Sequence, residues 1–232
     1  MTMVTRRRFA LAGAGLIALG PSAGHASALP ALTFTVLRDG SPIGTHRVDF
    51  ARDGESLRVD IAIDLEVRMF AIPVYRYGHR STERWRAGRL VGLSARTDDD
   101  GKRSEVRATA APGGLVIEGS GGRFVAPADT KPTSYWHEDM TRRQRFLDTQ
   151  NGTLLDVKVR PLGSSRALVA GHEIDMRSYE LSGDLSSRLG YGPTGEWVEL
   201  NFEARGSRIV YRRDAPPAAA AVSPAGPPRG PG

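Results

Sequence analysis

The longest run of strict alternation in the chain extends from Leu57 to Phe70 and reads LRVDIAIDLEVRMF. Its odd-numbered positions are apolar, and its even-numbered positions are charged except at Ala62 and Phe70. A period of two indicates a β-strand with one buried and one solvated face. At about 3.3 Å per residue the run spans roughly 46 Å, whereas ordinary strands have about 3–10 residues. Because strands twist, one of this length cannot stay flat, and we expect a curved sheet with an apolar concave side.

Shorter alternating segments, separated by turn residues, fill most of the chain between residues 32 and 214. Asp39-Gly40, Asp53-Gly54 and Asp100-Gly101 are turn sequences typical of β-hairpins. The spacing of these turns indicates about ten to twelve strands in sequential order. We therefore predict a mainly β protein: a long curved antiparallel meander sheet, in the form of a half-barrel or flattened barrel, with one short helix.

The helix is expected in the one region that departs from alternation, PTSYWHEDMTRRQRFLDTQNG. Long side chains recur there at helical spacing: Trp136, Met140, Arg143 and Leu147. Ser134 is a suitable N-cap, acidic residues follow it in the first turn, and Asn151-Gly152 can end the segment. The apolar concave side of the sheet has to be covered by this helix, by a second sheet or by a ligand.

An outer-membrane barrel is the main alternative for a strand of this length, because the strands of such barrels are long and alternate strictly. Here the other strands are short and carry arginine on either face. Aromatic residues make up only 7% of the chain, which is too few for two girdles at the membrane interfaces. The sequence therefore favours an open or flattened sheet in water.

Residues 1–28 have the three-part layout of a secretory signal peptide. Arg6, Arg7 and Arg8 are followed by an apolar run over residues 9–19, too short to span a bilayer, and by the small-residue site Ala26-Ser27-Ala28. Residues 5–11, TRRRFAL, resemble the twin-arginine export motif without its usual lysine, so general secretion stays an alternative. We expect cleavage after Ala28 and a periplasmic or otherwise exported protein, with membrane contact only through an uncleaved leader.

The rest of the chain divides into a single predicted β domain, residues 29–214, and a low-complexity Pro/Ala/Gly tail, residues 215–232, expected to be disordered. The chain has no cysteine, which excludes disulfides, thiolate catalysis and cysteine metal sites. Three of the 32 Lys and Arg residues lie in the leader, which leaves 29 against 26 acidic residues. With these charges interspersed, nucleic-acid binding is not expected.

Catalytic and metal sites find little support in the sequence. The four histidines after the leader, His46, His79, His137 and His172, show no His-x-x-x-His spacing. Ser81, His79 and Glu83 share one strand face, where their i, i+2, i+4 spacing is too extended for a catalytic relay. We therefore predict no catalytic residue, no metal and no cofactor.

A different cluster suits a partly wet, apolar pocket, because it combines aromatic rings with polar groups. The candidate ligand-binding residues are Tyr75, Tyr77, Glu83, Trp85, Tyr135, Trp136 and His137. The competing interpretation is ordinary core packing with hydrogen-bonded hydroxyl and indole groups. The segment TSYWHED is the favoured rim of such a pocket, because a helix start that crosses the sheet lies over its concave side.

Five blocks of sequence resemble an uncharacterised family of exported bacterial β proteins that is defined only as a domain of unknown function. They are VLRDGSPIGTHRVDF, IPVYRYGHRSTERWRAGRLVGLSARTDDDG, PTSYWHED, LDTQNGTLLDVKVR and EWVELNFEARGSRIVYR. The family is distantly similar, at the level of fold, to the lipoprotein carriers of the cell envelope. The resemblance implies an exported curved sheet and supplies no catalytic residues, and lipid binding follows from it only by analogy of fold.

Two functions are therefore expected from the sequence. The first is an exported, non-catalytic protein that holds an apolar or lipid-like ligand in a curved β-sheet. The alternative is a structural or assembly partner in the cell envelope that recruits another protein through a sheet edge. The expected partners are a hydrophobic small molecule or lipid, or an envelope protein, and an enzyme is the least favoured class.

Overall fold

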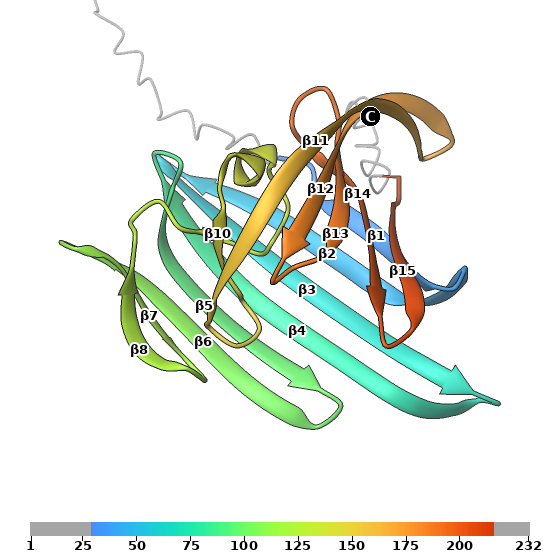
Figure 1. Ribbon diagram of the computed structural model, residues 1–232, viewed down its shortest axis with the longest axis horizontal. Helices are drawn as coiled ribbons and strands as arrows, with labels where there is room; N and C mark the ends of the chain where they lie inside the picture. Colours follow the sequence, from blue (N-terminus) through green and yellow to red (C-terminus); the bar gives the residue numbers. More distant parts are fainter. Residues whose placement is uncertain (1–28, 216–232) are drawn as a thin grey trace, which may run out of the picture.

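The computed structural model describes residues 29–215, which form one sheet of 15 strands and a short 3-10 helix, η1 (Figure 1). No helix within these residues is long and apolar enough to cross a membrane. The elements are β1 (Leu32–Arg38), β2 (Ser41–Asp53), β3 (Ser56–Met69), β4 (Ile72–Arg86), β5 (Arg89–Asp99), β6 (Lys102–Ala111), β7 (Gly114–Gly119), β8 (Gly122–Ala126), β9 (Lys131–Pro132), η1 (Glu138–Arg142), β10 (Arg145–Leu147), β11 (Leu154–Val169), β12 (His172–Gly183), β13 (Ser187–Tyr191), β14 (Trp197–Ala204) and β15 (Ser207–Arg213).

The strands follow a meander whose first and last strands, β1 and β15, pair in the middle of the sheet. The order is β8-β7-β6-β5-β4-β3-β2-β1-β15-β14-β13-β12-β11-β10-β9, and only β9 and β10 pair in parallel. The two free edges, β8 and β9, are therefore consecutive in the chain, and the sheet would close into a barrel if they paired. The predicted open, curved antiparallel sheet is confirmed, with 15 strands in place of ten to twelve. The expectation that the other strands are short is wrong, since β4 has 15 residues and β11 has 16, against 14 in β3.

Across this gap the β7–β8 turn and the β10–β11 turn lie in close contact. The amide of Ser120, in the β7–β8 turn, donates to the carbonyl of Asn151 at 2.8 Å. Gly119 lies so close that a Cβ there would be 2.5 Å from the same carbonyl oxygen. Only glycine fits at this crossing, which fixes the width of the opening near the β10–β11 turn.

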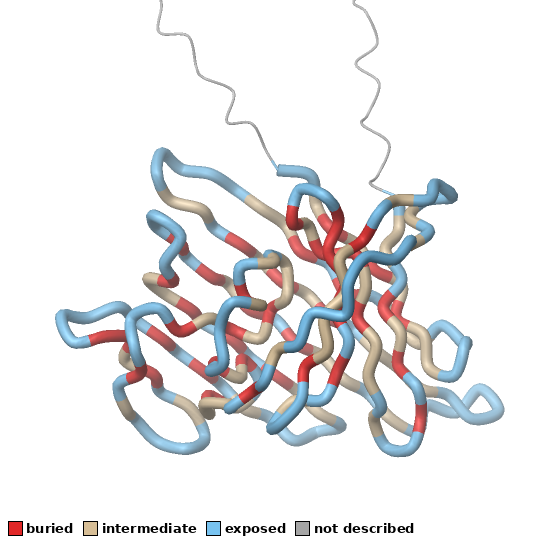
Figure 2. Tube along the Cα trace, turned by 45° about the horizontal axis from the view of Figure 1, so that its top comes forward, coloured by how far each residue is buried: buried red, intermediate tan, exposed pale blue. Residues whose placement is uncertain are grey.

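Strand β3 is the predicted long strand, and its inward face carries the core. Val59, Ile61 and Ile63 are buried, and charged residues on the outer face pair with each other, as in Arg58–Asp60 at 2.8 Å and Asp64–Arg80 at 2.8 Å. Buried residues lie along the middle of the strands, whereas the hairpin turns are exposed (Figure 2).

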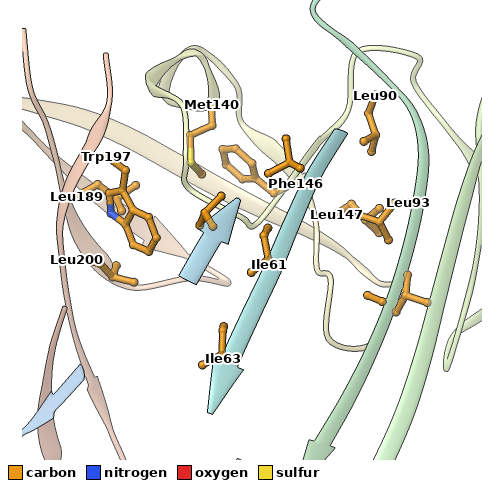
Figure 3. Packing of buried hydrophobic residues seen from close by; sticks show 14 of the residues in the cluster. Ile61, Ile63, Leu90, Leu93, Met140, Phe146, Leu147, Leu189, Trp197 and Leu200 are labelled. Atoms are coloured by element: carbon orange, nitrogen blue, oxygen red, sulfur yellow. The ribbon is translucent and has the colours of Figure 1, made fainter. Parts of the chain in front are cut away.

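Residues 131–147, here called the crossing segment, run over the concave side. Figure 3 shows Met140, Phe146 and Leu147 of this segment close to Ile61 of β3 and Leu93 of β5. The concave face of the sheet and the apolar side of the crossing segment are thereby buried against each other, which removes apolar surface of both from water. The cover expected over the concave face is thus supplied by the chain itself, over part of the sheet.

The helix predicted in this segment is reduced to the single 3-10 turn η1. Its N-cap is His137, whose Nδ1 accepts from the amide of Asp139 at 3.1 Å, rather than Ser134, which is buried. Phe146 and Leu147 are consecutive and both fully buried, and they pair with β11. In a helix, the backbone groups of Phe146 and Leu147 would be used within the helix and could not pair with β11. The segment is therefore extended here, although its apolar residues recur at helical spacing.

Candidate functional site

A groove of about 810 Å³ lies between one end of the concave sheet and the crossing segment. Its apolar lining comes from strands β1–β4 and from the crossing segment, with Leu32, Phe50, Leu57, Trp85, Trp136 and Met140 as main members. Charged and polar side chains also line it, among them Arg52, Lys131, His137, Glu196 and Arg213. This volume and this mixture of linings are typical of a site for a small molecule.

Two indole rings form the central wall of the groove. Trp85 ends the inward face of β4, where it is paired with Leu57 of β3 and Leu90 of β5. Trp136 belongs to the crossing segment and meets Trp85 edge to face, with ring centroids 5.5 Å apart and planes at 88°. Phe50 approaches Trp136 at the same centroid distance. The sheet buries Trp85, but Trp136 stays half-buried, with part of its ring facing the groove.

Glu83 sets the position of both rings from behind. Its Oε2 accepts hydrogen bonds from Trp85 Nε1 at 2.8 Å and from Trp136 Nε1 at 3.0 Å. Burial raises the pKa of the Glu83 carboxyl, and donors from Trp136, Ser134 and Trp85 oppose this rise. The Ser134 hydroxyl does not reach hydrogen-bond geometry with Oε1, which has no partner among the described residues. A fully buried carboxyl is thus retained where it holds one indole from the sheet and one from the segment above it.

The backbone next to Trp136 adopts a conformation that is rare for a large side chain. Tyr135 has a φ of 60°, in the left-handed region. Such a conformation persists only where surrounding contacts enforce it, and it is frequent at functional sites. Here the Tyr191 hydroxyl donates to the Tyr135 carbonyl at 3.0 Å, and the Tyr135 ring packs 5.8 Å from Trp197.

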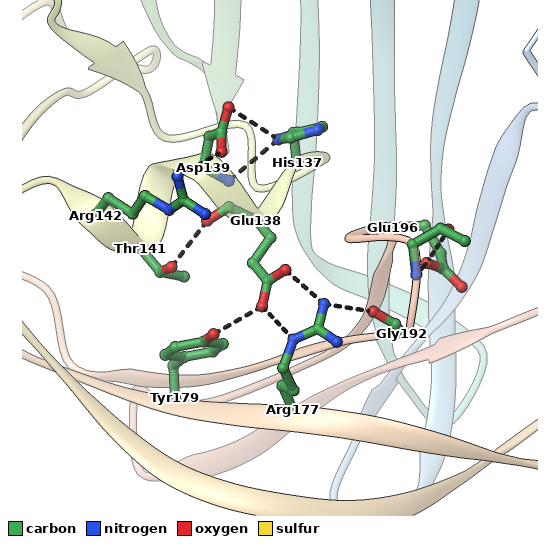
Figure 4. A network of polar contacts seen from close by, with 10 residues as sticks. His137, Glu138, Asp139, Thr141, Arg142, Arg177, Tyr179, Gly192 and Glu196 are labelled. Atoms are coloured by element: carbon green, nitrogen blue, oxygen red, sulfur yellow. Dashed lines mark hydrogen bonds and ion pairs between the residues drawn. The ribbon is translucent and has the colours of Figure 1, made fainter.

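Glu138 anchors the crossing segment to the other half of the sheet (Figure 4). Arg177 of β12 donates to both carboxylate oxygens, at 2.7 and 2.6 Å, and the Tyr179 hydroxyl adds a third bond at 2.7 Å. Arg177 also donates to the carbonyl of Gly192 at 2.9 Å. Bidentate pairs of this kind are strong and fix geometry. The segment is therefore held at Glu83 on one side and at Arg177 on the other, so the groove is preformed.

Lys131 is a half-buried cation on the groove wall. Its Nζ donates to the carbonyl of Gly88 at 2.7 Å and lies 4.7 Å from the centre of the Trp85 ring. No carboxylate among residues 29–215 lies within ion-pair distance of Lys131, and burial lowers the pKa of its ammonium group. Lys131 is thus a cation without a direct ion pair at the polar margin of an apolar groove, with Asp129 and Asp139 as the nearby surface acids that act on it.

The structure brings together five of the seven predicted ligand-binding residues. Trp85, Tyr135, Trp136 and His137 line the groove, and Glu83 lies directly behind it. Tyr75 and Tyr77 are on the same strand, ten and eight residues before Trp85, and do not reach the groove. At about 3.3 Å per residue they lie roughly 25–35 Å along β4, because a shared strand face does not mean a shared site.

Tyr75 has a different environment at that far end of the strand. Its hydroxyl donates to Asp99 at 2.6 Å, and Arg205 lies over its ring at 4.4 Å from the centroid. Burial raises the pKa of the Tyr75 hydroxyl to about 12. These contacts are those of a packed structural tyrosine.

Several lining residues were missed by the sequence analysis. Phe50 and Leu57 lie on the inward faces of β2 and β3. The register of the β2–β3 hairpin, which places Phe50 opposite Val59, is the signal that could have assigned both to the groove. Lys131 and Arg213 come from parts of the chain without any pattern that relates them to β4.

The residues that resembled a catalytic relay do not form one. His79 Nδ1 is 2.9 Å from the Thr97 hydroxyl, and the Ser81 hydroxyl has no hydrogen-bond partner among the described residues. Glu83 is engaged with the two indoles instead. Within residues 29–215 no group of three or more His, Asp or Glu side chains is placed to hold a metal ion.

Comparison with known proteins relates this geometry to two families of unknown function. The fold is similar to that of a crystal structure from Brucella abortus, described as a β-barrel-like protein of the domain of unknown function DUF1849. The TM-score is 0.57 at 9% sequence identity, and the match covers 81% of this chain and 97% of that one. No curated protein matches the sequence. Residues 34–214 match the domain of unknown function DUF6134, and the chain therefore belongs to the DUF6134 family.

Proposed function

We propose that this protein is an exported, non-catalytic binding protein that holds an apolar or lipid-like molecule in the groove under the crossing segment. The observation that carries the proposal is the wall of the groove, where buried Glu83 holds Trp85 and half-buried Trp136 at right angles. Burying a carboxyl costs free energy, whereas a filled core would need only apolar side chains at this position. The arrangement is explained if Trp136 has to present a fixed face to a ligand.

The lining indicates the chemistry of the ligand. Leu32, Phe50, Leu57 and Met140 offer an apolar surface beside the two indoles, which suits a hydrocarbon chain or ring system. Lys131 offers a cation at the margin of this surface. An amphiphile with an apolar body and a polar or anionic end satisfies both parts of the groove.

Export is part of the same proposal and rests on the sequence. The leader-like layout of residues 1–28 and the twin-arginine-like TRRRFAL support it, and these residues lie outside the described part of the structure. The expected tail, residues 215–232, also lies almost wholly outside the described part.

A second candidate is favoured by the open sheet. Edge strand β8 (Gly122–Ala126) is paired on one side only, with β7, and its Val125 is exposed. Such an edge can accept a strand from another protein. An assembly partner in the cell envelope would use this edge and would not need the groove to be empty.

The test is to purify the protein after export, analyse it by native mass spectrometry and extract it with organic solvent. The proposal expects a bound apolar molecule in the wild type and its loss in Trp136→Ala, with the fold retained. Arg58→Ser, on the outer face of β3 and away from the groove, is the matched control and should keep the ligand. A wild type free of ligand that co-purifies with a protein through β8 would support the second candidate instead.

A further inference from the structure

The end of the β3–β4 hairpin opposite the groove exposes four large apolar side chains close together in the sequence. Relative exposures are 59% for Met69, 95% for Phe70, 66% for Ile72 and 47% for Val74. The strands stay paired to the last residue, since Met69 still faces Ile72 in the ladder. This tip, residues 69–74, is therefore an ordered projection of the sheet and not a loose loop (Figure 1). Contiguous exposed apolar groups of this kind mark an interaction site.

The turn at the tip is built from residues that such turns normally avoid. Phe70 and Ala71 have φ values of 49° and 68°, the positive values required at both positions of a type I′ turn. Every other two-residue hairpin turn within residues 29–215 contains a glycine. At the tip a phenylalanine takes the left-handed conformation while its ring gains almost no burial. Such strain without a packing reward points to a function for the exposed ring.

Positive charge lies directly behind the apolar tip. Arg68 and Arg76 both donate to the carboxylate of Glu66, so one acid is shared by two guanidinium groups. Among the acids further along, Asp99 accepts from Tyr75 and lies 3.6 Å from Arg205, and Asp100 keeps its charge while it accepts from the amide of Arg76. Arg68 and Arg76 are both exposed beside the tip, and Glu66 is their only ion-pair partner among residues 29–215.

We propose that the tip inserts into the surface of a lipid bilayer, with Phe70 and Ile72 among the acyl chains and Arg68 and Arg76 at anionic headgroups. Exposed apolar side chains flanked by arginines are the arrangement that interfacial anchoring requires. A protein partner fits less well, because a stable interface engages about 20–30 residues a side and the tip offers four apolar ones. Strand addition is also excluded here, since β3 is paired on both sides by β2 and β4, and β4 by β3 and β5.

The proposal is independent of the groove, which is lined at the opposite end of the same hairpin by Leu57 and Trp85. It is tested with vesicles of phosphatidylethanolamine and phosphatidylglycerol, and with neutral phosphatidylcholine vesicles, in a co-sedimentation assay of the exported protein. We expect binding to the anionic vesicles that weakens as salt is raised.

The decisive variant is Phe70→Asn combined with Ala71→Gly, the residue pair that a type I′ turn prefers, so that the variant keeps its fold. Loss of the inserted ring should weaken vesicle binding by about tenfold or more. Leu168→Ser, which removes an exposed leucine next to another hairpin turn, is the control and should bind like the wild type. Wild type that ignores anionic vesicles, or a tip variant that binds them equally well, would overturn the proposal. Concentration-dependent dimers that the tip variant abolishes would overturn it too, and would assign the tip to a second copy of the chain.

Discussion

The two ends of the β3–β4 hairpin both carry apolar residues on the inward face, but one end is covered and the other is exposed. At one end, Leu57 and Trp85 continue the inward apolar face and lie under the crossing segment. At the other end, Met69 and Ile72 continue the same face and lie in water. The strands are equally well paired at both ends. The difference is made by a cover that comes from residues 131–147, far away in the chain.

This contrast shows what alternation can and cannot determine. A period of two determines which side chains share a face of the sheet, since a strand points successive residues to opposite sides. Burial needs a second layer, and the second layer covers β3 from Leu57 to about Ile63 but does not reach Met69. The long strand is thus a single structural unit with a core at one end and an exposed tip at the other.

The largest effect is expected when a charge is placed at equivalent positions on the two parts of this face. Ile61→Asp would bury an unpaired carboxylate, at a cost of several kcal/mol, on the order of the whole stability of a domain. Met69→Asp, on the same face of the same strand but exposed, should change the free energy of unfolding by less than about 0.5 kcal/mol. Urea denaturation followed by circular dichroism compares them. Equal effects at both positions would show that the cover does not decide burial.

Removal of the Glu83 carboxyl is also expected to destabilise the protein strongly and concerns the covered end alone. Glu83→Ala leaves two indole N–H groups without their acceptor, at a cost of about 2–4 kcal/mol. Glu83→Gln keeps an acceptor oxygen and removes the charge, so its cost should stay below about 1 kcal/mol. Denaturation midpoints measured by tryptophan fluorescence test both. If Gln is as damaging as Ala, the carboxylate charge, and not the acceptor, holds the wall.

Truncation of a tryptophan should separate a packed ring from a ring that lines the groove. Trp197 is fully buried, and Trp197→Ala should cost about 3–5 kcal/mol. Trp136 is half-buried, and its truncation should cost about 1–2 kcal/mol, below the range for a buried ring, while ligand retention is lost. Chemical denaturation and solvent extraction of the same samples give both results. A loss at Trp136 as large as that at Trp197, with no ligand in the wild type, would contradict the binding proposal.

Acid should weaken the covered core through two buried histidines that face Ile63 from β2 and β4. Burial lowers the pKa of His46 to about 3 and that of His79 to about 4. Both pKa values lie below the ordinary value of about 6.5, so below that pH the unfolded chain takes up protons that the folded protein refuses. Stability should therefore fall by about 1 kcal/mol per histidine between pH 6.5 and 5.5.

Glu83 acts in the opposite direction, because its raised pKa favours the folded state as pH falls. The measurement is therefore a comparison of wild type with His46→Leu over this pH range. His46 has no hydrogen-bond partner within the described residues, so leucine removes only the titrating group. The variant should lose about half of the acid sensitivity, and an unchanged slope would exclude His46 as its source.

The sequence predicted the parts of the fold that depend on neighbours along the chain. The shared face of His79, Ser81, Glu83 and Trp85 on β4 followed from their spacing, and the structure buries all four side chains. Strands tolerate proline mainly at bulges and strand ends, and Pro73 lies opposite Arg68, next to the register shift between Val67 and Arg68 of β3. An uncharacterised family of β proteins was recognised from its sequence blocks, and the match to a domain of unknown function supports that recognition.

The parts that were not predicted depend on contacts between distant segments. Tyr75 and Tyr77 were grouped with Trp85 by face, but their position along β4 separates them from it. The spacing of Trp136 and Met140 suggested a helix, whereas pairing of Phe146 and Leu147 with β11 made the segment extended. Lys131 joins the site only because β9 passes the β4–β5 turn, where Gly88 accepts its hydrogen bond. A pattern of neighbouring residues does not indicate which distant segments of the chain come into contact.

The smallest effect is expected at the exposed tip, and its sign is informative. Phe70→Asn places in the left-handed conformation a residue that adopts it readily, whereas phenylalanine pays a steric cost there. Because the ring of Phe70 is almost fully exposed, its removal exposes little buried area. Asparagine should therefore stabilise the free protein by about 0.5–1 kcal/mol in urea denaturation.

Asp39→Asn is the control, at a turn with a similar φ of 49°. It replaces one residue that tolerates this conformation by another, and its side-chain oxygen can still accept from the amide of Arg208, so stability should change little. A more stable variant that binds bilayers less would show that the strained phenylalanine is kept for contact with a partner. A less stable variant would show instead that the Phe70 ring packs in the folded protein. The tip would then be less exposed than the structure indicates, and the two ends of the hairpin would differ less in burial.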